Sequence, residues 1–313
     1  MNLEKIKPHL PWLTLVGLIL LVGVSDPSFL HPKNLLNIMG DVVPLMIMAL
    51  GITFTIYIGG IDLSSQSMAN MTTVLACLTL PFMGPFGALF CLLIGFVAGL
   101  LSGLITTRFF VPSFISTLAI GGIAMSAGDW LSGQRALYMN AELREKYYLW
   151  MIEKTWIIPN ELIIAVVIVI LLWILQNRTR FGRALKAVGA GELAATASGI
   201  NVGRIKIIAF GISGMLAALA GVMFAVKLSG GSPTIANGFL LLAIVAVLVG
   251  GTPLTGGVGG VVNTLIGAMI VAVIRTSMLY FEVDATHQQM VFGVILIAAI
   301  ALTIDRAKLK IVK

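Results

Sequence analysis

Apolar runs separated by short polar breaks dominate this chain and decide what it can fold into. A helix that crosses a lipid bilayer needs roughly 20 mostly apolar residues. Only 11% of the 313 residues are charged, whereas soluble domains have roughly 25%. The strict alternation of apolar and polar residues typical of a membrane β-barrel is absent. The sequence therefore predicts an all-α membrane protein, a polytopic bundle of about ten transmembrane helices that forms a single domain over residues 1–313.

The apolar runs place these helices. We expect them at about Pro11–Val24, Asp41–Ile58, Gln66–Leu80, Phe86–Thr107, Ser113–Leu131, Glu161–Leu175, Ile207–Val226, Gly238–Gly250, Val261–Leu279 and Gln289–Ile304. Pro81 is expected to end the third helix. No small-x-small cleavage site follows the first run, so we expect an uncleaved helix there. Gly95, Gly99 and Gly103 share one face of the fourth helix, where another helix can approach closely.

Charge distribution predicts the orientation of the bundle. The segment at about 176–206 contains six Arg or Lys residues and one acid, Glu192. The segment at about 133–160 balances its basic and acidic residues and is rich in Tyr and Trp. Because cytoplasmic segments of membrane proteins are enriched in Lys and Arg, we expect 176–206 inside and 133–160 outside. The basic residues Lys5, Lys7, Arg306, Lys308, Lys310 and Lys313 then place both termini in the cytoplasm, as an even number of spans requires.

A polar stretch, Gly59-Gly60-Ile61-Asp62-Leu63-Ser64-Ser65-Gln66-Ser67, interrupts the apolar sequence. A carboxylate at membrane depth persists only where it faces protein, water or a polar solute. Asp62 or Ser64 either caps the following helix or borders a solute path, and one role does not exclude the other. Gln66 and Asn70 follow at spacings of four, on the same helix face as Asp62. Carboxylate, hydroxyl and amide groups on one face suit a polyhydroxylated solute.

Other polar residues in or beside the predicted spans either line a path or join helices by hydrogen bonds. They are Asp41, Asn70, Thr72, Asp129, Asn263, Thr264, Arg275 and Gln288. We take Asp62, Ser64, Gln66, Asn70 and Asn263 as the candidates for the solute path.

The pattern G-G-x-x-L-[S/T] occurs twice, from Gly59 and from Gly250. Both copies follow an apolar run, one in each half of the chain. In a glycine-rich chain such an echo is either accidental or marks paired broken segments of the kind that line transporter paths.

A short alanine-rich helix is expected at Glu192–Ser198, closed by Gly199. Glycines on both sides isolate this helix on the basic segment. It either inserts into a groove of another protein or lies on anionic lipid.

Several functions are not supported by the sequence. The glycine-rich stretch Gly250–Gly260 lacks the Gly-Lys-Ser/Thr of a phosphate-binding loop. No HExxH, CxxC or histidine cluster indicates a metal site, and no chain of membrane-embedded acids indicates a proton relay. No clustered basic face on a soluble module indicates nucleic-acid binding. Cys77 and Cys91 lie in apolar runs, where buried thiols rather than a disulfide are expected.

Three motifs together resemble the inner-membrane permease subunits of bacterial ABC sugar importers of the ribose type. They are Gly59-Gly60-Ile61-Asp62-Leu63-Ser64; Phe181-Gly182-Arg183 through Gly189, Glu192, Ala194, Ala195, Gly199 and Ile200; and Val249-Gly250-Gly251-Thr252 with Gly256-Gly257-Val258-Gly259. The resemblance covers nearly the whole chain. It departs at Ser65-Gln66-Ser67, where the family usually has Val-Gly-Ser.

The resemblance implies import of a monosaccharide or related polyol through the bacterial inner membrane. It implies three partners besides membrane lipid: a cytoplasmic ABC ATPase, a periplasmic sugar-binding protein and a second permease subunit. ATP and Mg²⁺ would bind to the ATPase, and this chain would bind no cofactor and catalyse no reaction. The residues implied to dock on the ATPase are Arg183, Gly189, Glu192, Ala195 and Gly199. The alternative is a stand-alone, ion-coupled secondary transporter or channel; the basic cytoplasmic segment and the missing acid relay argue against it.

Overall fold

The computed structural model describes residues 10–303, apart from the side chains of residues 10, 285–286 and 300–303. Its helices are α2 (Leu10–Ser25), η2 (Pro27–Leu30), α3 (Pro32–Tyr57), α4 (Ser65–Met83), α5 (Phe86–Arg108), α6 (Ser113–Ser132), α7 (Ala141–Tyr147), η3 (Leu149–Met151), α8 (Asn160–Arg178), α9 (Arg180–Ala190), α10 (Glu192–Ala197), α11 (Val202–Leu228), α12 (Phe239–Val249), α13 (Val261–Tyr280) and α14 (Ala285–Thr303). Four two-residue strands complete the described structure: β1 (Leu137–Tyr138), β2 (Lys154–Thr155), β3 (Ile158–Pro159) and β4 (Gly230–Gly231).

The predicted all-α membrane fold is confirmed, and every predicted span coincides with a helix. Within residues 10–303, six helices combine the length and mean hydropathy needed to cross a bilayer: α3, α5, α6, α8, α11 and α13. The helices α2 and α12 and the part His287–Ala299 of α14 are apolar but shorter, and α4 is a buried 19-residue helix with several polar residues. The basic residues from which both termini were predicted to be cytoplasmic lie outside the described part of the chain.

Two predicted boundaries were wrong. Helix α3 begins at Pro32, nine residues before Asp41, because proline is well suited to the first helical turn and the following polar residues continue the helix. Helix α4 continues through Pro81 to Met83 and stops at Gly84, whose φ is +52°. A proline in the last turn removes only one backbone hydrogen bond, so it need not end the helix.

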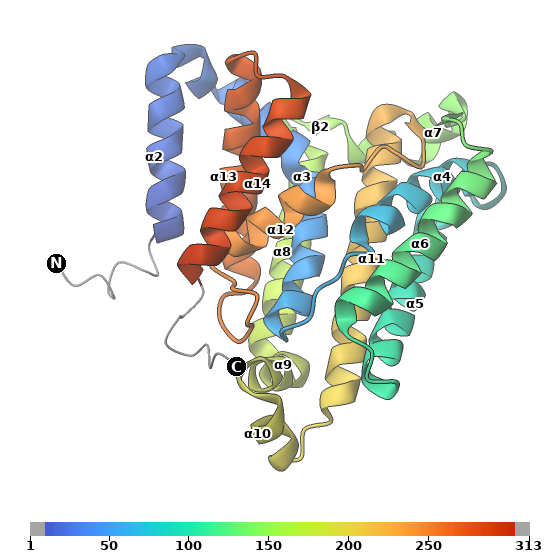
Figure 1. Ribbon diagram of the computed structural model, residues 1–313. Coiled ribbons are helices and arrows are strands. Elements are labelled where there is room, and N and C mark those ends of the chain that lie inside the picture. Colours follow the sequence, from blue (N-terminus) through green and yellow to red (C-terminus); the bar gives the residue numbers. More distant parts are fainter. Residues whose placement is uncertain (1–9, 304–313) are drawn as a thin grey trace.

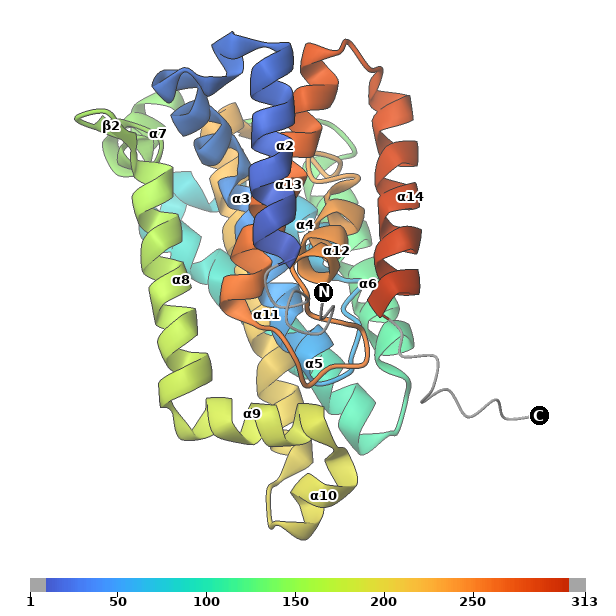
Figure 2. The ribbon, with the colours of Figure 1, turned by 90° about the vertical axis from the view of Figure 1, so that its left-hand side faces the viewer.

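The helices run between two ends of the bundle, which we name by the short helices found there. Figure 1 shows α9 and α10 protruding at one end, here called the α10 end, and α7 at the other, the α7 end. The described start of α2 and the described end of α14 both lie toward the α10 end (Figures 1 and 2). Segment 133–159 covers part of the α7 end. It therefore lies opposite the basic segment 176–206, as the charge pattern predicts.

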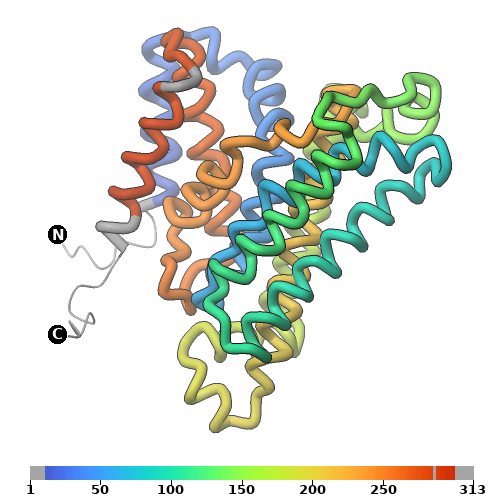
Figure 3. The backbone as a smooth tube through the Cα atoms, turned by 45° about the vertical axis from the view of Figure 1, so that its right-hand side comes forward, coloured from blue at the N-terminus to red at the C-terminus, as the bar shows by residue number. Residues whose placement is uncertain are grey.

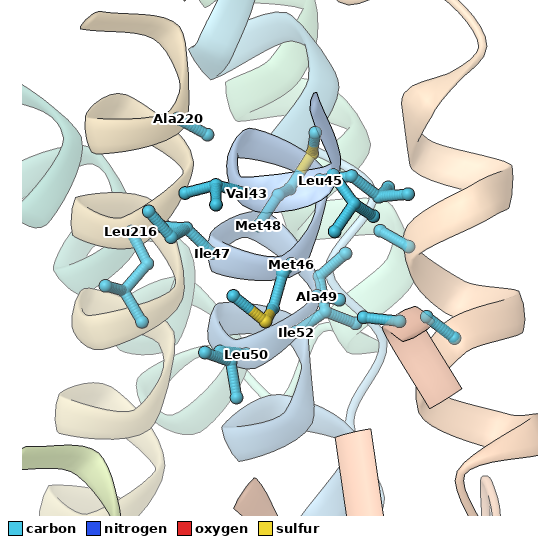
Figure 4. Packing of buried hydrophobic residues seen from close by; sticks show 14 of the residues in the cluster. Val43, Leu45, Met46, Ile47, Met48, Ala49, Leu50, Ile52, Leu216 and Ala220 are labelled. Atoms are coloured by element: carbon cyan, nitrogen blue, oxygen red, sulfur yellow. The ribbon is translucent and has the colours of Figure 1, made fainter. Parts of the chain in front are cut away.

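Helix α11 is the central element and packs along α3, α4 and α5. Figure 4 shows Leu216 and Ala220 of α11 against the buried residues of α3. The predicted glycine face of α5 is confirmed. A Cβ on Gly99 would lie 2.1 Å from the carbonyl oxygen of Phe210, and one on Gly95 would lie 2.4 Å from that of Gly214. Only glycine permits the two backbones to approach so closely.

Two membrane segments are only partly helical. Helix α12 has 11 residues, which is roughly 16 Å at 1.5 Å per residue, about half of a bilayer core of ~30 Å. The non-helical segment 229–238 precedes it, on the side of the α7 end (Figure 3). Segment 58–64 leads into α4 in a similar way from the α10 end (Figure 1). Broken segments inside a bundle are tolerated where other protein groups satisfy their backbone.

The segment at the α7 end is folded onto the bundle. Strand β1 pairs with β4 in antiparallel register, with Leu137 opposite Gly231. The hydroxyl of Tyr148 donates to the carbonyl of Gly84 (3.1 Å) and accepts from the nitrogen of Ala88 (3.0 Å). Burial raises the pKa of this Tyr148 hydroxyl, so it stays a neutral hydrogen-bonding group at physiological pH.

Candidate functional site

The segment between α3 and α4 is organised around the carboxylate of Asp62, which is 1% exposed. Its Oδ1 accepts hydrogen bonds from the backbone nitrogen (2.9 Å) and the hydroxyl (2.6 Å) of Ser64. Its Oδ2 accepts from the hydroxyls of Ser65 (3.0 Å) and Ser213 (2.6 Å). Four donors thus surround one buried acid, which compensates for its burial and ties the segment to α11.

Asp62 also prepares the start of α4. The bond from the Ser64 nitrogen to the Asp62 side chain closes a turn of the kind that precedes helices, and Ser64 is the N-cap residue. Gly59, with φ +72°, follows the C-cap residue of α3, Ile58. Asp62 therefore holds the turn before α4, but the predicted cap is not formed, because the N-cap residue Ser64 makes no capping bond with its side chain. Because Asp62 and Ser64 are both buried, their place on a solute path remains a prediction.

Gln66 and Asn70 lie one turn apart on α4 and hold the non-helical segment before α12. The Oε1 of Gln66 accepts from the nitrogen of Gly238 (2.9 Å), and the Oδ1 of Asn70 accepts from that of Ala236 (2.6 Å). The Nδ2 of Asn70 donates to the Oδ1 of Asn237 (2.9 Å). Gln66 and Asn70 therefore share a helix face, as predicted, and it faces the broken segment of the other half of the chain. The prediction was wrong for Asp62, which precedes α4 and binds Ser213 of α11 instead.

Asn237 is a site residue that the sequence analysis missed. It lies 167 positions after Asn70, in a segment with no periodicity, and no pattern in the sequence links the two. The fifth path candidate, Asn263, lies elsewhere. Its Nδ2 donates to the carbonyl of Gly250 (3.0 Å) and so fixes the end of α12.

The two copies of the repeated glycine pattern meet at the α10 end. Gly257 donates its backbone hydrogen bond to the carbonyl of Tyr57 (2.8 Å), so the segments that follow α12 and α3 lie side by side. Gly189, in the last turn of α9, packs against both. A Cβ there would lie 2.3 Å from the Tyr57 oxygen and 2.9 Å from the Gly257 nitrogen. We call this contact of Tyr57, Gly189 and Gly257 the glycine junction.

The basic segment folds into two helices, of which the sequence analysis predicted only one. Helix α9 was missed, although Phe181, Leu185 and Val188 follow a helical spacing with their apolar side chains. Helix α10 was predicted correctly: it spans Glu192–Ala197 and closes at Gly199, with φ +79°.

Helix α10 has little contact with the rest of the protein. Of its residues only Ala195 is buried, at 3% exposure, whereas the apolar side chain of Leu193 is 89% exposed. Glu192 forms an ion pair with Lys206 of α11. Arg183 and Gly199 are exposed as well. Of the five residues implied to dock on an ATPase, Arg183, Glu192 and Gly199 are therefore on the surface, Gly189 is in the glycine junction, and Ala195 anchors α10.

A cleft of about 430 Å³ opens at the α10 end. Its lining includes residues 58–61, the segment that joins α5 to α6, and Lys206 and Phe210 of α11. Lys206 thus contacts Glu192 of α10 on one side and borders the segment leading to Asp62 on the other.

Metal and disulfide chemistry find no support in the described part of the chain. No group of three His, Cys, Asp or Glu side chains there could hold a metal ion. Cys77 and Cys91 are both buried and free.

A helical membrane bundle with broken polar segments inside and an exposed helix on one end is the architecture of a transport subunit. Comparison with known proteins identifies it further. The family described as "Branched-chain amino acid transport system / permease component" matches residues 34–300. The chain belongs to this family and is a multi-pass membrane permease.

Similar proteins are sugar permeases. The chain is 34% identical to the ribose import permease protein RbsC of Bacillus subtilis over 95% of its own length and 92% of the relative's. It is 32% identical to RbsC of Escherichia coli K12, over 92% and 91% of the two chains. It is 30% identical to the galactose/methyl galactoside import permease protein MglC of E. coli K12, over 93% and 92%.

Proposed function

We propose that this chain is the membrane-spanning subunit of an ATP-binding-cassette importer that moves a monosaccharide or related polyol into the cytoplasm. Membership of the permease family supports the class. The ribose and galactose permeases to which the chain is similar over more than nine-tenths of its length support the substrate class. The observation that most directly supports coupling to an ATPase is the exposed α10, with Leu193 projecting from it.

In this proposal α10 inserts into a groove of a cytoplasmic ATPase, and the α10 end faces the cytoplasm. Both termini would then be cytoplasmic, in agreement with the charge pattern. A periplasmic sugar-binding protein docks on the α7 end, and a second permease subunit completes the pathway. ATP and Mg²⁺ bind to the ATPase, so this chain hydrolyses nothing.

The glycine junction provides a physical route for coupling. Movement of α10 reaches α9, and Gly189 of α9 is in direct backbone contact with Tyr57 and Gly257. Those two residues precede the segments that start α4 and α13. Because backbone groups in such contact have no room to slide independently, a displacement of α9 shifts both segments together. Gln66 and Asn70 at the start of α4 would respond by releasing or tightening their hold on the segment before α12.

The experiment that tests this proposal compares variants at two exposed, apolar positions that lie at opposite ends of the bundle. Leu193→Asp places a charge on α10, and Ile157→Asp, at a position 67% exposed, does the same at the α7 end. Each variant is co-expressed with the ATPase of its own transport system, and ATPase retention and ATP-dependent uptake of radiolabelled D-ribose and D-galactose are measured. We expect Leu193→Asp to lose both, and Ile157→Asp to retain the ATPase.

Full retention of the ATPase and normal uptake by Leu193→Asp would overturn the docking role of α10. Uptake of neither sugar by the wild-type complex would overturn ribose and galactose, the solutes named for the similar permeases, as the solute of this chain. Glu192→Lys offers an independent check, because it places a second cation beside Lys206 and is expected to uncouple uptake without affecting membrane insertion.

A further inference from the structure

A cavity of about 370 Å³ opens between α3, α11, α12 and α13 in the half of the bundle toward the α7 end. The four helices are labelled in Figure 1. A volume of this size lies within the range of small-molecule sites, ~300–1,000 Å³. Aliphatic side chains form much of the wall, whereas Asp41, Lys227 and Arg275 supply charged groups. Ionisable side chains within membrane-spanning helices indicate a functional site unless their pairing alone explains them.

Two of these charges belong to an ion-pair network, which balances them. The Nζ of Lys227 lies 2.8 Å from a carboxylate oxygen of Asp41 and 3.0 Å from one of Glu161. Glu161 is 6% exposed, whereas the Asp41 side chain is 73% exposed, so Asp41 is the acid of the network that a ligand can reach. The two cations, Lys227 and Arg275, balance the charges of the two acids, Asp41 and Glu161. A charge-balanced cavity favours a neutral polar solute over an ion.

Arg275 is the unusual member of the set. It lies on α13, and its guanidinium makes no hydrogen bond or ion pair with any group in the described part of the chain; it lies over the ring of Phe239, 5.0 Å from the centroid. Its five N–H groups are therefore open to a ligand. A polar group inside a membrane bundle is unfavourable unless a partner satisfies it. Hydroxyl groups of a solute would provide that partner.

Aromatic rings form one side of the same cavity. Phe224 and Phe239 meet edge to face with their centroids 4.8 Å apart, and both line the cavity. Phe224 is 7% exposed, and Arg275 lies over the Phe239 ring, so the two rings form an apolar wall beside the charged groups that would bind a sugar's hydroxyls.

Phe239 and Arg275 also line a second, smaller cavity of about 190 Å³. Asn237, Gln288 and Gln289 contribute amides to its wall. Asn237 is the residue that Asn70 binds, so the second cavity adjoins the contact of α4 with segment 236–238. The pair formed by Arg275 and Phe239 therefore separates the larger cavity from the polar region around Gln66 and Asn70.

We propose that the larger cavity is a binding site for a neutral monosaccharide, in which Arg275 and Asp41 bind the hydroxyl groups and Phe224 and Phe239 form an apolar wall. The solute occupies this site before it passes the Arg275–Phe239 pair toward Asn237. This proposal rests on the proposed sugar-importer function and adds a residence site for the solute within this chain.

A kinetic experiment tests the role of Arg275. The variant Arg275→Met retains an apolar stem of similar length but has no donors. Its matched control is Arg178→Met, because Arg178 lies over the ring of Trp173 in the same way (5.7 Å) and is on the last turn of α8. In proteoliposomes with the complete transporter, we expect Arg275→Met to raise the KM for D-ribose or D-galactose at least tenfold, and Arg178→Met to change it less than twofold. An unchanged KM in Arg275→Met would overturn the proposal.

A labelling experiment tests occupancy without relying on transport. Thr276 lines the cavity and is half-buried. Thr276→Cys is made in a background in which Cys77 and Cys91 are replaced by alanine, and it is treated with a membrane-impermeant maleimide. We expect millimolar D-ribose or D-galactose, whichever the wild-type complex takes up, to slow labelling at least threefold. Asp284→Cys, an exposed position beyond α13, should react at the same rate with and without sugar.

The two failures are distinguishable. Absence of sugar uptake by the wild-type complex would refute the proposed function. Normal uptake together with unprotected Thr276→Cys and an unchanged KM in Arg275→Met would refute the binding site alone.

Discussion

Replacing Asp62 by alanine removes the acceptor of four hydrogen bonds at once. Hydrogen bonds to a charged group contribute about 1.5–3 kcal/mol each, but the four share one carboxylate whose burial is itself unfavourable. Removing one partner of a buried charged cluster typically destabilises a protein by about 3–5 kcal/mol. At roughly 2 °C per kcal/mol for a chain of this size, we expect Asp62→Ala to lower the apparent Tm by about 6–10 °C.

Asp62→Asn is the milder change. Its side-chain oxygen retains both bonds from Ser64, and the hydroxyls of Ser65 and Ser213 can rotate to accept from the new amide. A loss of about 1–2 kcal/mol, or roughly 2–4 °C, follows. The variant is therefore expected to assemble, and reduced uptake by the assembled protein would place Asp62 on the solute path as well as at the helix start.

The buried cysteines provide the assay. Cys77 is 6% exposed and Cys91 is fully buried, so a thiol-reactive fluorescent dye reports their exposure as the solubilised protein unfolds. Asp129→Ala is the control, since Asp129 is a half-exposed acid of α6. An Asp62→Ala protein that melts within about 2 °C of wild type, equivalent to roughly 1 kcal/mol, would refute the structural role assigned to the carboxylate.

Three further variants test other contacts. Gly189→Ala would press a Cβ against Tyr57, so we expect a loss of about 1–3 kcal/mol and weaker sugar-stimulated ATPase activity; wild-type values of both would contradict the glycine junction. Lys227→Met leaves the buried Glu161 without its cation and is expected to lower stability by about 3 kcal/mol, most of which Lys227→Met/Glu161→Gln should restore in the same dye assay. Gln66→Ala frees the backbone donors of Gly238 and Leu240 at the start of α12, so uptake should fall while stability drops by only about 1–2 kcal/mol; unchanged uptake would argue against a role of this contact in transport.

Most of the helical framework could be predicted from the sequence because it depends on local composition. Apolar runs mark spans wherever they lie, and the glycine spacing on α5 marks a close helix contact without identifying the partner. The short α10 was predictable for the same reason, since Gly191 and Gly199 bound it. Helix α9 has an equally local pattern that was overlooked in a segment dominated by its charges.

The sites were less predictable because they join distant parts of the chain. Asp62 stands out as a buried acid, but its partner Ser213 is 151 residues away. Asp41 and Arg275 were noted only as polar residues in spans. Nothing in the sequence indicates that Lys227 bridges Asp41 to Glu161, because each of the three lies on a different helix. Such contacts follow from tertiary packing, which periodicity does not encode.

The most direct test of the account is uptake by proteoliposomes that contain this chain with its ATPase and binding protein, with all ion gradients collapsed by ionophores. We predict that ATP and Mg²⁺ enclosed on the ATPase side drive accumulation of D-ribose or D-galactose, and that omission of the ATPase abolishes it. Accumulation by this chain alone, driven by a proton or sodium gradient and indifferent to ATP, would contradict the central claim.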